Sequence, residues 1–196
     1  MSFRKIEYEG EIYYYLRGRF LDASFIEVPA ILREKLTKFY FLNIDYKALP
    51  PLDALHYLID IKDSGMYDLS IQVGEYLLEV QSNNLRIIKI VVPILMSSYR
   101  QFEQPVKAIK LFYEYSILHP EIVNSVWLTP LASAYLDTRN IAEGIKYAIL
   151  AYEKQGDKYR MTALTVVFER IKFIINRDIL AELKSGKLES LKKEFL

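Results

Sequence analysis

The chain has 196 residues, of which 52% are apolar and 26% charged, a composition typical of soluble globular proteins that excludes disordered and collagenous classes. Its 26 basic and 25 acidic side chains leave a net charge of +1, too little for the whole molecule to attract nucleic acid or an anionic membrane. The absence of cysteine excludes disulfides, thiolate nucleophiles and sulfur-ligated zinc. The charged N-terminus and the shortness of the longest apolar stretch, Ile90–Met96, predict a cytoplasmic protein without an export signal or a membrane partner.

Residues 3–28 differ from the rest of the chain in the spacing at which apolar residues recur. Apolar and acidic residues alternate at the start of this segment, and Tyr13–Tyr15 favour a strand. Gly10 and Gly18 are turn formers between these short runs. We therefore predict a β-hairpin or meander of two or three strands, which should dock its apolar face on the helices that follow because so small a sheet is marginally stable in water.

From Pro29 onward the apolar period changes to 3.6 residues, which predicts helices. The first helix falls within residues 29–50. Its apolar stripe consists of Ile31, Leu32, Leu36, Phe39 and Tyr40. Further helical segments are expected at 51–62, 67–80, 85–101, 104–118, 121–137, 140–155, 158–176 and 178–195. No Gly/Ser-rich or Pro-rich linker separates them, so the sequence predicts a single domain over residues 1–196.

Three helix pairs share one pattern of apolar and small residues. The clearest copy, in residues 89–122, consists of Val92, Leu95, Met96, Tyr99, Ala108, Phe112 and Pro120. The next, in residues 125–158, consists of Leu128, Leu131, Ala132, Tyr135, Gly144, Ala148, Ala151 and Gly156. A more divergent copy in residues 51–84 consists of Ala54, Tyr57, Leu58, Ile61, Ser70, Gly74 and Leu77. Small residues belong where two helices cross closely, and large ones between successive pairs.

This pattern resembles the tetratricopeptide repeat (TPR) family, whose motif runs W-x2-L-G-x2-Y, A-x3-F and P. The resemblance implies a mainly α fold, a TPR-like α-solenoid of antiparallel helix pairs with a short N-terminal β-hairpin or meander. The expected parts are a β appendage at 3–28, a first helix within 29–50, three TPR-like pairs over 51–158 and capping helices in 159–196. Another array of helical pairs and an irregular helical bundle are the alternatives.

In the TPR family, the first helix of each pair lines a concave groove that takes an extended peptide or a partner helix. The equivalent positions in this chain are Leu52, Leu55, Ile59, Ile90, Ser97, Gln101, Val126, Thr129, Ser133 and Asp137. They are mostly apolar with a few small polar groups, which suits an amphipathic helix or an apolar peptide. They lack the basic and asparagine cluster that binds the carboxylates of chaperone tails in that family.

Two prolines fall inside the first helices of consecutive pairs. Pro93 and Pro130 have no N–H and should leave the carbonyl groups of Lys89 and Val126 without their helical donors. One interpretation is that both helices kink and water binds these carbonyls. The other is that the carbonyls face the groove and accept hydrogen bonds from a bound chain.

No motif for catalysis is present. His56 and His119 stand alone, so no metal or other cofactor is expected. The alternation of Glu7, Glu9 and Glu11 is typical of the charged edge of a hairpin, more than of a paired-carboxylate site. The basic C-terminal part, residues 158–196, fits a polar capping face or a surface for an acidic partner.

These patterns predict a non-enzymatic protein that binds a protein or peptide partner. A homo-oligomer is the first alternative, because 16 tyrosines and 10 phenylalanines place aromatic rings near the surface. Single-stranded nucleic acid is a weaker alternative, since aromatic and arginine side chains alternate between Tyr13 and Phe20 but the segment around them is net acidic. An enzyme without a recognisable motif is the last.

Overall fold

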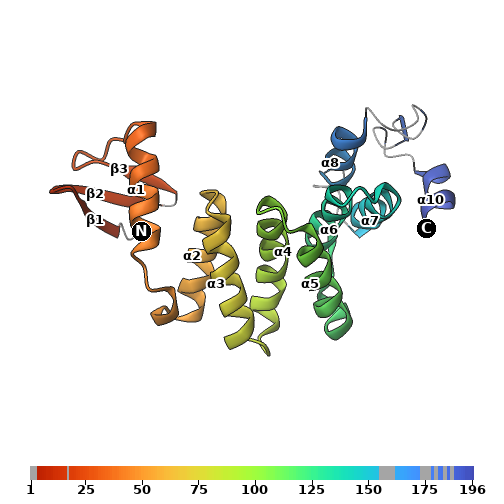
Figure 1. Ribbon diagram of the computed structural model, residues 1–196, viewed down its shortest axis with the longest axis horizontal. Coiled ribbons are helices and arrows are strands. Elements are labelled where there is room, and N and C mark those ends of the chain that lie inside the picture. Colours follow the sequence, from red (N-terminus) through yellow and green to blue (C-terminus); the bar gives the residue numbers. More distant parts are fainter. Residues whose placement is uncertain are drawn as a thin grey trace. The chain divides into compact units, whose positions relative to one another are not determined.

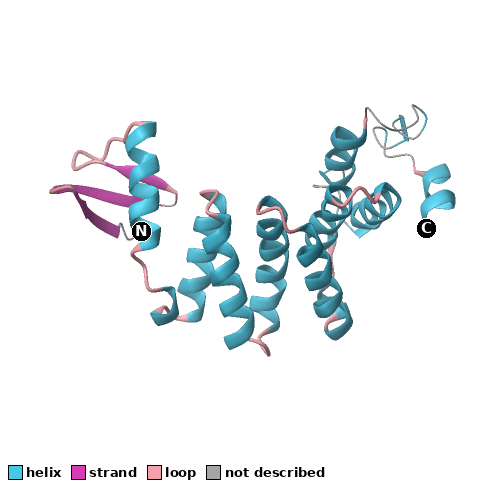
Figure 2. Ribbon diagram, in the orientation of Figure 1, coloured by secondary structure: helices cyan, strands magenta, loops and turns pink. Residues whose placement is uncertain are grey.

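The computed structural model describes residues 4–16, 18–154, 162–172 and 188–196, together with positions 178, 181, 182 and 185. The described part is mainly helical with a small antiparallel sheet at its N-terminal end, which confirms the predicted class (Figure 2). The chain divides into two compact units, Met1–Leu77 and Leu78–Leu196. The division falls inside a helix and not in a linker, so one domain over residues 1–196 stays a prediction.

The sheet has three strands, β1 (Arg4–Tyr8), β2 (Glu11–Leu16) and β3 (Arg19–Leu21), paired in the order β1-β2-β3. The turn between β1 and β2 consists of Glu9 and Gly10, both with positive φ, of 51° and 81°. Two such residues match the twist of an antiparallel hairpin, and glycine adopts this conformation at little cost. Since Glu9 lies in this turn, the three N-terminal glutamates do not line one strand.

The sheet packs on helix α1 (Ala30–Leu42), as Figure 1 shows. The buried ring of Tyr15 lies 4.7 Å from that of Tyr40 and 5.7 Å from that of Phe41, measured between centroids. Aromatic contacts of this kind stabilise packing beyond the area they bury. The predicted docking of the sheet on the first helix is therefore confirmed, and Tyr15 is not exposed for stacking on a nucleic-acid base.

The predicted apolar stripe of α1 is wrong at two positions. Ile31 and Phe39 are exposed, although Phe39 still contacts the ring of Tyr8 edge-on at 5.0 Å. The buried side of the helix consists of Leu36, Tyr40 and Phe41. The reason is that α1 packs on the small sheet along one side, which leaves Ile31 in the first turn without a neighbour to cover it.

The remaining helices follow the predicted segments. Beyond the short η1 (Tyr46–Ala48) they are α2 (Pro51–Asp63), α3 (Tyr67–Val80), α4 (Leu85–Gln101), α5 (Pro105–Leu118), η2 (Pro120–Ile122), α6 (Ser125–Asp137), α7 (Ile141–Lys154), α8 (Thr162–Ile171) and α10 (Glu189–Phe195). Helix α6 begins at Ser125 and not at 121, because the side chain of Asn124 caps it by accepting from the backbone N–H of Val126 at 2.9 Å. Apart from positions 178, 181, 182 and 185, the other parts predicted helical between 155 and 187 lie outside the described residues.

Three turns repeat the same backbone geometry. They join α2 to α3, α4 to α5 and α6 to α7, each with one residue of positive φ: Gly65 at 76°, Glu103 at 58° and Arg139 at 61°. In each turn the next residue donates its N–H to the last aligned residue of the first helix, and these pairs are Met66 to Ile61, Gln104 to Tyr99 and Asn140 to Tyr135. Such bonds satisfy carbonyls at a helix C-terminus. The aligned positions therefore recur as structure as well as sequence.

Within the second unit, each helix from α4 to α7 contacts the next helix along the chain. Helix α6 also contacts both α4 and α8. The crossing of α6 with α7 is close: a Cβ added to Gly144 would lie 2.5 Å from Leu136 Cδ2. This confirms the prediction that Gly144 lies where two helices approach. No helix of the described residues is long and apolar enough to cross a membrane.

Candidate functional site

The predicted groove positions of the neighbouring helices α4 and α6 include both exposed and buried side chains. Ile90 is 41% exposed and Val126 is 61% exposed. Their places in the two aligned copies are equivalent. Gln101, at the other end of α4, is exposed as well. The structure thus places apolar side chains at one end of this face and polar ones at the other.

The hydroxyl groups on this face are already satisfied by their own helices. Ser97 Oγ donates to the carbonyl of Pro93 at 2.9 Å, and Thr129 Oγ1 donates to that of Ser125 at 2.8 Å. Both side chains are half-buried. Ser133 is buried, so its side chain lies beneath this face and not on it.

The positions predicted on α2 differ among themselves. Leu52 is exposed and Ile59 is half-buried, whereas Leu55 is buried in the core of the first unit. Leu55 therefore contributes to packing and is not accessible to a partner. Repeat alignment predicts the position but does not show how closely neighbouring side chains cover it.

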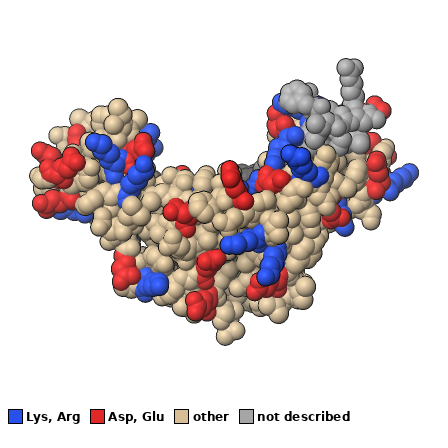
Figure 3. Space-filling view, in the orientation of Figure 1, with Lys and Arg blue, Asp and Glu red and all other residues tan. Residues whose placement is uncertain are grey.

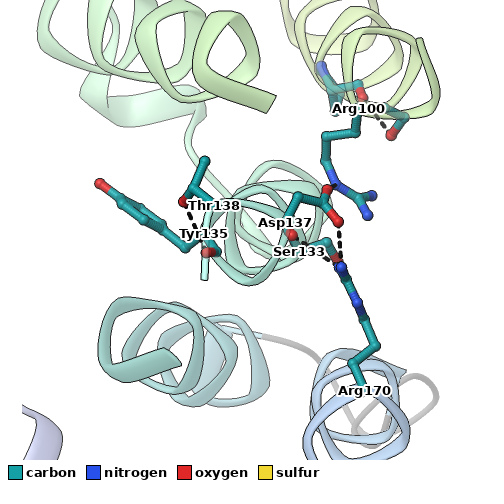
Figure 4. A network of polar contacts seen from close by, with 8 residues as sticks. Arg100, Ser133, Tyr135, Asp137, Thr138 and Arg170 are labelled. Carbon is teal, nitrogen blue, oxygen red and sulfur yellow. Dashed lines mark hydrogen bonds and ion pairs between the residues drawn. The ribbon is translucent and has the colours of Figure 1, made fainter. Parts of the chain in front are cut away.

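Asp137 lies between two arginines that sequence reasoning did not assign to the site. Arg100 Nε donates to Asp137 Oδ2 at 2.7 Å, and Arg170 Nη2 forms an ion pair with Asp137 Oδ1 from the other side (Figure 4). Arg170 Nη1 also donates to the carbonyl of Ser133 at 2.9 Å. The three charged side chains come from α6, α4 and α8, so this cluster connects these three helices.

The cluster has one more positive than negative charge. The side chain of Arg100 is only 16% exposed, and burial lowers its pKa while the hydrogen bond and charge of Asp137 oppose that shift. An arginine keeps its proton at neutral pH even so. Asp137 is therefore needed to hold two guanidinium groups close together in a partly desolvated place.

The carbonyl group freed by Pro93 has a partner within the protein. Trp127 Nε1 donates to the carbonyl of Lys89 at 3.0 Å, and its indole is fully buried. The Lys89 carbonyl thus has an internal donor that neither interpretation of Pro93 drawn from the sequence included. The bond joins α4 to α6 and orients the face on which Ile90 lies.

On α5, α6 and α7, three tyrosine hydroxyls meet. Tyr113 lies 2.9 Å from Tyr135 and 2.6 Å from Tyr147 between hydroxyl oxygens, and the rings of Tyr135 and Tyr147 are stacked. Burial, and next the hydrogen bond to Tyr113, raises the pKa of both Tyr135 and Tyr147. The hydroxyls of Tyr135 and Tyr147 therefore stay neutral at pH 7, and their stacked rings pack α6 against α7.

Charge is mixed over the surface that Figure 3 presents, where basic and acidic side chains alternate. Among the described residues, no three histidine, aspartate or glutamate side chains are grouped so that they could hold a metal ion. The basic side chains of the C-terminal part include Lys172 and Lys192, which pair with Glu169 and Glu153.

The arrangement thus combines exposed apolar side chains, Ile90 and Val126, with a charged cluster at Asp137. Comparison with known proteins finds no protein-family model that matches this chain and no curated protein with a significant match.

Proposed function

We propose that this protein is a non-catalytic TPR-like repeat protein of the cytoplasm that binds an apolar peptide or an amphipathic helix of a partner protein. The binding surface is the outward face of α4 and α6. The observation that carries the proposal is the exposure of Ile90 and Val126 at equivalent positions of adjacent helices. Apolar side chains exposed in register on neighbouring helices are typical of partner surfaces.

The repeated turns at Gly65, Glu103 and Arg139 support the TPR-like part of the proposal, since each has a residue of positive φ and a hydrogen bond back to the aligned end of the preceding helix. The contacts of α4 with α6 and of α6 with α8 support it too, because first helices of successive pairs are neighbours in a solenoid. In this arrangement the face of α4 and α6 would continue along the array.

The Trp127 to Lys89 hydrogen bond and the Arg100, Asp137 and Arg170 cluster support a preformed surface. They fix the separation of α4, α6 and α8 before any partner binds. A rigid surface lowers the entropy cost of binding. The guanidinium groups also supply hydrogen-bond donors for backbone carbonyls of a bound segment.

The test compares two variants of the tagged protein in nuclease-treated co-purification from its own cells, followed by mass spectrometry. Ile90→Glu combined with Val126→Glu places charge on the proposed surface. Ile31→Glu, also at an exposed isoleucine, is the matched control on the first unit. A stoichiometric partner that is retained by wild type and the control but lost by the double variant supports the proposal. A partner retained equally by all three contradicts it.

A further inference from the structure

Helix α5 exposes a second apolar face, separate from the face of α4 and α6. Val106 is 68% exposed and Ile117 76% exposed, with the half-exposed ring of Tyr113 between them. These residues are spaced seven and four apart, so they share one side of the helix. Over the rise of an α-helix, this stripe is about 16 Å long.

Two charged side chains flank the stripe on the same side. Lys110 and Glu114 are both exposed, and neither forms an ion pair with another residue of the part that the structure describes. Lys110 lies toward the N-terminus of α5 and Glu114 toward its C-terminus. The flank therefore changes sign along the helix, which makes it complementary to a reversed copy of itself.

We infer that α5 is the contact of a homodimer, in which this stripe packs against the same stripe of a second copy running antiparallel. A two-fold axis at the level of Leu111 and Phe112 brings Val106 level with Ile117 of the other copy. The same axis places Lys110 within one residue of the level of Glu114 of the other copy. Since a two-fold axis keeps each flank on its own side, two Lys110 to Glu114 pairs form at once.

A second copy of this chain is the partner that this face fits, because the stripe and its charged flank are complementary to themselves when reversed. Self-complementarity in both shape and charge is what an isologous interface requires. A pair of helices of this length buries less than about 1,200 Å², at the small end of specific interfaces. We therefore expect a weak dimer, with a dissociation constant of roughly 10 to 100 μM.

Charge exchange across the axis tests both the contact and its antiparallel sense. In a dimer of Lys110→Glu, both pairs across the axis consist of two glutamates, and in a dimer of Glu114→Lys both consist of two lysines. The dissociation constant of each variant should therefore be at least about tenfold higher than that of wild type. An equimolar mixture of the two variants restores two opposite-charge pairs and should dimerise as wild type does. Sedimentation equilibrium between about 5 and 500 μM, a range that brackets the expected dissociation constant, gives each dissociation constant.

Two further variants separate this face from the partner surface. Ile117→Glu should abolish the dimer, whereas Val126→Glu, at an apolar side chain that is also exposed but lies on α6, should leave it intact. Circular dichroism checks that each variant keeps its helices. We expect that it does, because the substituted side chains are exposed. A wild-type chain that is monomeric at the highest concentration overturns the inference. So does a mixture of the two charge variants that stays monomeric while wild type dimerises.

Discussion

Trp127 donates its indole N–H to the one carbonyl of α4, that of Lys89, from which Pro93 removes the helical donor. The bond length is 3.0 Å and the indole is fully buried. A buried carbonyl without a partner costs about 1 to 3 kcal/mol. The proline and the tryptophan, on two different helices, are thus a matched pair: the first creates an acceptor and the second satisfies it.

Trp127→Phe should lower the free energy of unfolding by about 3 kcal/mol, because it removes both the donor and part of a buried ring. In a Pro93→Ala background, the introduced alanine supplies the missing N–H, so the same substitution should cost about 1 kcal/mol less. Urea denaturation of the wild type, both single variants and the double variant measures this coupling. The loss of ring volume is common to both backgrounds and cancels. Additive effects would show that the hydrogen bond does not depend on the proline.

The sequence was sufficient to predict that Pro93 frees the Lys89 carbonyl, because the helical hydrogen-bond pattern is fixed by geometry. It could not identify Trp127 as the donor. Periodicity shows which side of a helix is buried but not which side chain of another helix lies opposite a given carbonyl. The same limit applies to the candidate site. Alignment of the repeats predicts that Asp137 lies on the groove, but Arg100 and Arg170 reach it from other helices. Spacing within a helix does not show how far that helix is shifted along its neighbour.

The turn before α5 leaves room for a stabilising substitution. Gln104 is the N-cap of α5, and its Oε1 is buried without a hydrogen-bond partner in the described part of the chain. In the equivalent turn before α7, Asn140 Oδ1 accepts from the N–H of Glu143 at 3.3 Å. Asparagine is a better N-cap than longer side chains because its oxygen reaches the first turn.

Gln104→Asn should therefore raise the free energy of unfolding by about 1 kcal/mol, by adding the cap and removing an unsatisfied oxygen. Gln104→Ala is the control, since it removes the same oxygen without adding a cap and should give a smaller gain. Thermal and urea denaturation compare the three proteins. A Gln104→Asn variant less stable than Gln104→Ala would mean that the turn does not accept a side-chain cap.

Asp137 is expected to stabilise the second unit by compensating the positive charges of Arg100 and Arg170. Asp137→Asn should lower the free energy of unfolding by about 2 kcal/mol, less than for a fully buried pair because the cluster is partly exposed. Adding Arg100→Gln to this variant removes the uncompensated repulsion and should recover part of the loss. The effect of Asp137→Asn should also shrink in 1 M salt, which screens charges beyond about 3 Å.

Glu34→Gln is a control for this comparison, because it breaks the pair of Glu34 with Lys38 on the exposed face of α1. A surface pair of this kind contributes little, so its removal should not change the denaturation midpoint measurably. If Asp137→Asn proves as mild as Glu34→Gln, the cluster does not hold α4, α6 and α8 together.

Alkaline pH should destabilise the first unit through Tyr57. Its buried hydroxyl donates to the carbonyl of Phe41 at 2.6 Å, and burial raises the pKa of Tyr57 well above its ordinary value near 10. Burial, and next the charge of Asp60, raises the pKa of Tyr15 in the same direction. Above pH 10 the unfolded chain loses these protons while the folded chain keeps them. Stability is therefore fully present below pH 10 and falls as the pH rises toward the pKa of the folded state.

Each buried tyrosine should contribute up to about 1.4 kcal/mol of lost stability per pH unit above 10. Tyr57→Phe removes one such contribution. The variant should be less stable than wild type at pH 7, because the carbonyl of Phe41 loses its donor, yet its stability should fall less steeply between pH 9 and 11. Urea denaturation at several pH values measures both slopes. Lysine titration affects both proteins alike, so parallel slopes would show that Tyr57 ionises equally easily in the folded and unfolded chain.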